Sequence, residues 1–261
     1  MRLIESIKNI RPFRAFKICF GLYLANLWFS SFIFIDKLFR LNSISLHPSE
    51  YWNFIIEHNL SYALVGSFVV AALGLMFNKT TRISAIWLLA NWIIFFHLMP
   101  FIYSPPNGGY IGWCLLWFIF YPEDYITPSQ RQCWWIILGA GFCISGYSKW
   151  FSPLWVQGEA LWYIGLKPPF TELQKIPLMV KIMTYSTLIL ETFAIFFIWN
   201  RWGRFAVWIA FCGMHFFITL SMSVAEVGLF FLIFNLALVE DNKLPTQKTA
   251  LPQSDEKTNK I

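Results

Sequence analysis

Residues 178–222, LMVKIMTYSTLILETFAIFFIWNRWGRFAVWIAFCGMHFFITLSM, contain two long apolar runs separated by a short polar turn at 200–204. A helix needs about 20 predominantly apolar residues to cross the hydrocarbon core of a bilayer. The runs 178–199 and 205–222 are close to that length, and neither shows the period-2 alternation of a barrel strand. We therefore expect two membrane-spanning helices here.

Further apolar segments extend this pattern over most of the chain. They are 15–35, 60–77, 83–103, 109–122, 133–151 and 225–239. Charged residues are 13% of the chain, whereas a soluble domain carries about 25%. The sequence thus predicts an all-α polytopic membrane protein of about eight transmembrane helices, in which 109–122 and 225–239 are short enough to be re-entrant.

The basic residues of the short loops predict the orientation. They occur near the N-terminus, where Lys17 is the last of five, and in alternate loops, at Lys79, Arg82, Arg131, Arg201 and Arg204. The loops 104–108 and 222–226 contain no Lys or Arg. Lys and Arg accumulate on the cytoplasmic side. We expect an integral protein of a bacterial inner (plasma) membrane, with both termini cytoplasmic and the segment 152–177 outside.

The same pattern divides the chain into three parts. Residues 1–14 are expected to form a cytoplasmic amphipathic segment, 15–239 the transmembrane domain, and 240–261 a disordered cytoplasmic tail. The net charge of +6 is explained by the cytoplasmic loops and forms no dense patch, which argues against a nucleic-acid partner. The histidines are far apart and have no metal-binding spacing, so no metal site is predicted.

Ionisable residues at membrane depth are costly and are therefore candidates for function. Glu191 and His215 fall at similar depth on consecutive predicted helices, so they are expected to form an intramembrane pair, either structural or part of a proton relay. His97 and Glu226 fall near the outer ends of their segments, at about the depth of Lys149. They are further candidates for a catalytic site, with a packing role for His97 as the alternative.

Residues 146–161, GYSKWFSPLWVQGEAL, place Lys149 at the outer end of an apolar run, followed by aromatics, a proline and a glycine. A lysine at a membrane boundary can extend its ammonium to the headgroups. It can also act as a base where apolar surroundings favour the uncharged amine. Lys149 is thus the candidate catalytic base. A buried amine would favour an enzyme, and an amine exposed to the headgroups would favour a non-catalytic protein.

The order Gly146-x-x-Lys149-aromatic-x4-Trp155-x-x-Gly158-x-Ala160-Leu161 resembles the HTTM (horizontally transferred transmembrane) family, which includes the vitamin K-dependent gamma-glutamyl carboxylase. Asn107-Gly-Gly-Tyr110 and the run from Gly228 are similar as well. The resemblance implies that Lys149 deprotonates a reduced quinone, which is a lipid-soluble cofactor. Apart from the resemblance, the residues do not identify a cofactor. The carboxylase has a histidine where this chain has Gly108 and Gly109. The size of the chain fits better the related branch for maturation of a bacterial sporulation-delaying protein.

Two functions follow as expectations. The first is a membrane enzyme that uses Lys149 as a base on a lipid-soluble quinol or a peptide. The second is a non-catalytic membrane protein for maturation or export of a secreted antimicrobial peptide, or a partner of another membrane protein. A transporter is less favoured, because inverted repeats are not visible in the sequence.

Overall fold

The computed structural model describes residues 11–32, 60–98, 108–222 and 224–240. Several sequence predictions lie outside these ranges. They concern most of the amphipathic segment 1–14, the first connection 36–59, most of the loop 104–108 and the tail beyond residue 240.

Each predicted apolar segment forms a helix within the described ranges. The long helices are α2 (Pro12–Phe32), α5 (Ser61–Gly74), α6 (Thr81–Leu98), α8 (Gly108–Phe120), α9 (Pro128–Lys149), α12 (Pro177–Phe197), α13 (Arg201–Ser221) and α14 (Ala225–Leu236). The segment between α9 and α12 adds α10 (Pro153–Val156), α11 (Ala160–Ile164) and the 3-10 helix η2 (Phe170–Lys175). No strand occurs in the described part of the chain, so the predicted all-α class is confirmed.

Fewer of the helices are long enough to cross a membrane than the sequence predicts. Among the described helices, α12 and α13 are long and apolar enough to cross a bilayer. The apolar helices α5, α8 and α14 have 14, 13 and 12 residues. At 1.5 Å per residue they extend about 18–21 Å, less than the roughly 30 Å of a hydrocarbon core. By length and composition alone, the structure supports membrane association through α12 and α13.

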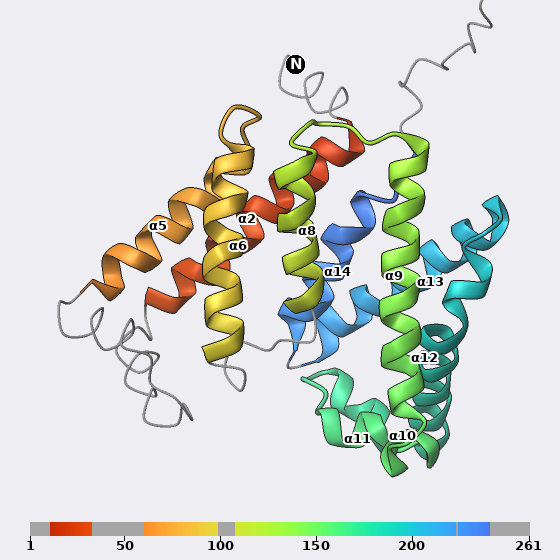
Figure 1. Cartoon of the computed structure of the whole chain (residues 1–261). Helices are drawn as coiled ribbons and strands as arrows, with labels where there is room; N and C mark the ends of the chain where they lie inside the picture. Colours follow the sequence, from red (N-terminus) through yellow and green to blue (C-terminus); the bar gives the residue numbers. More distant parts are fainter. Residues whose placement is uncertain (1–10, 33–59, 99–107, 223, 241–261) are drawn as a thin grey trace, which may run out of the picture.

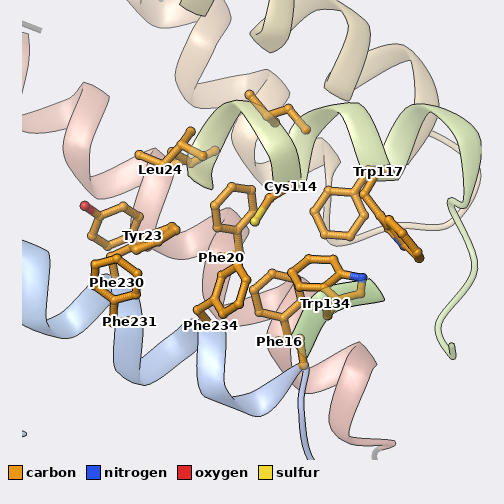
Figure 2. Packing of buried hydrophobic residues seen from close by; sticks show 14 of the residues in the cluster. Phe16, Phe20, Tyr23, Leu24, Cys114, Trp117, Trp134, Phe230, Phe231 and Phe234 are labelled. Carbon is orange, nitrogen blue, oxygen red and sulfur yellow. The ribbon is translucent and has the colours of Figure 1, made fainter. Parts of the chain in front are cut away.

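The helices pack in pairs around an aromatic core. Helix α2 packs against α5 and α14, α6 against α8, α9 against α12, and α13 against α14 (Figure 1). Figure 2 shows rings from α2, α8, α9 and α14 meeting in this core. The centroid of the Trp134 ring is 5.2 Å from that of Phe16 and 5.0 Å from that of Phe234. Aromatic pairs at such distances add to the stability that burial gives. The core therefore joins the first described helix to the last.

A buried charge cluster fixes one end of α2. The fully buried Lys17 forms an ion pair with Asp124, and its ammonium also donates to Asn78 and to the carbonyl of Pro122. These partners come from the loops after α5 and α8. Because every donor direction of the ammonium points to an oxygen, the cluster has a structural role.

Two glycines bring α9 close to α12. Gly139 and Gly146 are seven residues apart and so share one face of α9. A Cβ on Gly146 would lie 2.6 Å from the backbone nitrogen of Thr192, and one on Gly139 would lie 3.3 Å from the Cα of Ile195. Small residues allow this close packing. It places the end of α9 directly beside residues 191–192 of α12.

Candidate functional site

Lys149, the last residue of α9, points inward rather than out to solvent. Its ammonium forms a short ion pair with Oε2 of Glu191 on α12 and donates to Oγ of Ser145 at 3.1 Å. The ammonium also lies 4.7 Å from the ring centroid of Trp155, within cation–π range. The Lys149 side chain is only 19% exposed. The alternative in which the amine reaches the headgroups does not describe this geometry.

Glu191 completes the arrangement from the neighbouring helix. Its side chain is 8% exposed. Ser145 donates to the same oxygen, Oε2, at 3.1 Å. The other oxygen, Oε1, has no hydrogen-bond partner among the described residues. A proton donor, the ammonium, and an open acceptor, Oε1, therefore lie side by side.

The sequence motif around Lys149 has a structural explanation at each position. Gly146 permits the close approach of α9 to α12, one turn before Lys149. Trp155, at the start of the following segment, covers the ammonium. Gly158 has φ +78°, a left-handed conformation that favours glycine, and packs on Lys181 and Tyr185 of α12. Ala160 and Leu161 are buried at the start of α11. The motif thus encodes one connected unit around the lysine.

A cavity of about 280 Å³ adjoins this pair. Lys149, Glu191, Ser145 and Trp155 line it together with His215, and most of the remaining wall is apolar. The cavity lies between the aromatic core and a smaller hydrophobic cluster formed by Leu161, Leu166, Val180 and Met222. The polar groups therefore gather at one place in an otherwise apolar pocket, a common arrangement for ligand binding.

His215 contributes a second polar group to the cavity. The ring is 2% exposed and lies 4.7 Å from the Phe231 ring, nearly parallel to it. Its Nδ1 is 2.8 Å from the carbonyl oxygen of Phe211. Because a carbonyl only accepts, Nδ1 carries the proton in this contact, and Nε2 of the neutral ring keeps a lone pair. No described residue is hydrogen-bonded to Nε2.

The predicted pair of Glu191 and His215 has a different form from the one expected. Both side chains line the same cavity. Within the described part of the chain, however, no hydrogen bond or ion pair joins them, and Glu191 is paired with Lys149 instead. The two residues line one cavity, as their similar depth predicted. The rotation of each helix about its axis, however, directs the Glu191 carboxylate to Lys149.

The two other candidates are not brought into this group. Glu226 lies in the first turn of α14, is exposed, and does not line the cavity. Position 97 belongs to α6, but the His97 side chain is outside the part that the structure describes. Among the described residues, no group of three or more His, Cys, Asp or Glu could hold a metal ion.

Sequence reasoning missed Ser145 and the role of Trp155. Ser145 lies four residues before Lys149, a spacing that puts both side chains on one helix face. That spacing was a usable signal. The contact of Trp155 depends on the turn at Trp150 and Phe151, which separates α9 from α10 and has no periodic signature.

The fold and the site define an all-helical protein with an ion-paired lysine at the wall of an apolar cavity. No protein-family model, curated protein or solved structure matches this chain.

Proposed function

We propose that this chain is an integral membrane enzyme of the HTTM, carboxylase-like kind, in which Lys149 transfers a proton to or from a ligand bound in the adjoining cavity. The observation that carries the proposal is the inward position of Lys149, in contact with Glu191 and beside the cavity. A lysine that only anchored the chain at the interface would gain nothing from a carboxylate on a neighbouring helix.

The proposed architecture is a bundle of eight spans with both termini in the cytoplasm. Helices α12 and α13 are long enough to supply two of these spans. The short helices α5, α8 and α14 would cross together with their apolar flanking residues. The loops that carry Lys and Arg alternate with loops that do not, which supports the orientation.

The ligand that fits is an amphipathic molecule with a hydroxylated ring or a similar polar head. The cavity, at about 280 Å³, is close to the lower limit of about 300 Å³ for small-molecule pockets. The head group would fill it and an apolar tail would extend into lipid. Lys149, Glu191 and His215 are donors and acceptors suited to ring hydroxyls. A reduced quinone, as the resemblance implies, would supply such a hydroxyl group, and a peptide side chain is the other substrate in view.

In this function each group of the site has a separate task. Lys149 exchanges the proton with the ligand. Glu191 orients the amine and holds the compensating charge, and Ser145 fixes both groups from within α9. Trp155 and the apolar walls exclude water, which strengthens the electrostatic interactions at the site.

Lys149→Arg is the decisive variant, because arginine keeps the charge and the ion pair with Glu191 but does not release its proton at physiological pH. Secreted peptides and membrane quinones would be compared by mass spectrometry among cells with the wild type, the deletion and each variant. We expect the mass change that depends on the wild type to be lost in Lys149→Arg. Lys181→Arg, at an exposed lysine of α12, is the matched control and should behave as the wild type. Full function of Lys149→Arg would rule out the enzyme.

A second candidate is a non-catalytic protein for maturation or export of a secreted peptide. It is favoured by the exposed aromatic surface around α10 and α11, where Phe151 and Tyr163 are 72% and 68% exposed. A peptide or another membrane protein could cover this surface. In that function Lys149→Arg would remain active, while replacement of both aromatics by serine would abolish processing.

A further inference from the structure

A second cavity lies at the opposite end of the bundle from Lys149. It has a volume of about 350 Å³ and is formed by the start of α9, the start of α13 and the residues that follow α14. This is the end at which α9 begins, at the top in Figure 1. Its walls are largely apolar and come from Trp135, Phe205, Trp208 and Leu238.

The rim of this cavity is positively charged. Arg201 and Arg204 line it, and an adjoining cavity of about 70 Å³ shares Arg204 and adds the buried Arg131. Among the described residues, Glu240 is the only carboxylate in the two linings. Arg201 and Arg204 together with Glu240 leave a formal charge of +1, so the rim would attract an anion.

Arg201 and Arg204 keep donors available for such an anion. Arg201 is exposed and makes no hydrogen bond or ion pair with any described residue. Arg204 uses Nη1 for two long hydrogen bonds, 3.4 Å to Gln132 Oε1 and 3.3 Å to the carbonyl of Ile198. Its Nε and Nη2 have no partner in the described part of the chain. A guanidinium presents a planar fork that matches the oxygens of a phosphate.

Exposed aromatics place the rim at the height of lipid headgroups. Trp199 and Trp202, on either side of the turn into α13, are 63% and 79% exposed, and tryptophan concentrates at the membrane–water interface. Phe205 is exposed one turn beyond Arg201 on the same face of α13. The positive rim therefore continues into an apolar surface, in the direction of the hydrocarbon.

We propose that this cavity binds an anionic phospholipid of the cytoplasmic leaflet, with the headgroup phosphate on Arg201 and Arg204 and acyl carbons along Phe205 and Trp208. The apolar walls favour a lipid over free phosphate, which would use only the arginines. Basic pockets between helices on the cytoplasmic side are suited to acidic headgroups. This site is separate from the Lys149 cavity and rests on the proposed membrane location and orientation of the chain.

The test is lipid binding to the purified full chain in detergent. Native mass spectrometry would follow phosphatidylglycerol, with phosphatidylcholine as the zwitterionic control and inorganic phosphate as competitor. The double variant Arg201→Gln with Arg204→Gln would be compared with a loop control, Lys79→Gln with Arg82→Gln. This control removes the same charge from two exposed residues, one in the turn after α5 and one in the first turn of α6. The single variant Arg201→Gln covers the case in which loss of the Arg204 contacts prevents folding.

We expect wild type and loop control to retain phosphatidylglycerol in preference to phosphatidylcholine, and the double variant to bind it roughly thirtyfold more weakly. Arg201→Gln alone should give an intermediate loss. Equal losses in the loop control would mean a general charge effect and would overturn the site. Unchanged binding in the double variant would overturn it as well. Displacement of the lipid by millimolar inorganic phosphate would contradict a lipid site and indicate a site for the free anion.

Discussion

Gly146→Ala should disrupt the Lys149 site without touching any of its polar groups. A Cβ at position 146 would lie 2.6 Å from both the backbone nitrogen and Oγ1 of Thr192, and 2.9 Å from its Cα. Two of these atoms belong to the backbone of α12 and cannot rotate away. The two helices would have to separate by several tenths of an ångström or more, one turn from the contact between Lys149 and Glu191.

The magnitude follows from two opposing effects. Forcing a methyl group into packed surroundings costs about 1–3 kcal/mol. Replacement of glycine by alanine within a helix returns up to about 1 kcal/mol. The net loss of stability should be about 1–2 kcal/mol, which corresponds to a fall in melting temperature of roughly 2–8 °C for a protein of this size.

Thermal unfolding of the purified protein in detergent measures this change. The matched control is Gly213→Ala on α13, where an added Cβ meets no atom within 4 Å and stability should be unchanged or slightly raised. Function should fall in Gly146→Ala and persist in Gly213→Ala. If Gly146→Ala melted at or above the temperature of the control, the close packing of α9 on α12 would not be the basis of the site.

Three further perturbations test other parts of the structure. Glu191→Gln leaves the lysine ammonium without its carboxylate and should cost about 3–5 kcal/mol in detergent unfolding. Glu172→Gln, in an exposed ion pair, should cost less than about 1 kcal/mol, and equal losses would refute the buried pair. Asp124→Asn removes the carboxylate from a fully buried lysine and should lower the melting temperature more than Glu172→Gln does. Accessibility reporters at Ile261 and within 152–177 should report the cytoplasm and the outside respectively, and the same side for both would contradict the eight-span arrangement.

Long apolar runs made the helices predictable, but polar residues shifted their ends. Helix α9 was expected from residue 133 and begins at Pro128. Thr127 accepts from the Gln130 backbone at 3.3 Å, and the Gln130 side chain accepts from the Thr127 backbone at 2.8 Å. This capping box was present in the sequence as T-x-x-Q. A prediction guided by hydrophobicity alone passed over it.

Contacts between distant helices were less predictable. Counting residues gives the depth of Glu191, but it does not give the rotation of α12, so depth alone favoured His215 as its partner. Lys149, at the end of α9, was an alternative partner for Glu191. Gly146, one turn earlier, was the signal that α9 meets a neighbour closely at this level. The sequence does not say which neighbour that is, since tertiary packing selects α12.

Lys17 illustrates the same limit with a charged residue. Its basic charge was counted toward a cytoplasmic N-terminus, which needs no partner. The structure buries the side chain fully and pairs it with Asp124, 107 positions later. Counting charges predicts on which side of the membrane a segment lies. The burial of Lys17 depends on contacts with the loops after α5 and α8, and no local sequence pattern encodes those contacts.

The geometry of Lys149 bears on function because stability alone does not account for it. At the end of a helix near an interface, an outward lysine keeps its hydration and interacts favourably with the helix dipole. Turning it inward onto Glu191 costs hydration of both ions, and the attraction between them offsets that cost without a clear surplus. Ser145, Trp155 and the close packing at Gly146 all support the inward position. Beside an apolar cavity with the open acceptor Oε1, such a preorganised pair is suited to proton transfer. In the proposed function, the free energy lost in burying these charges preorganises them for proton transfer.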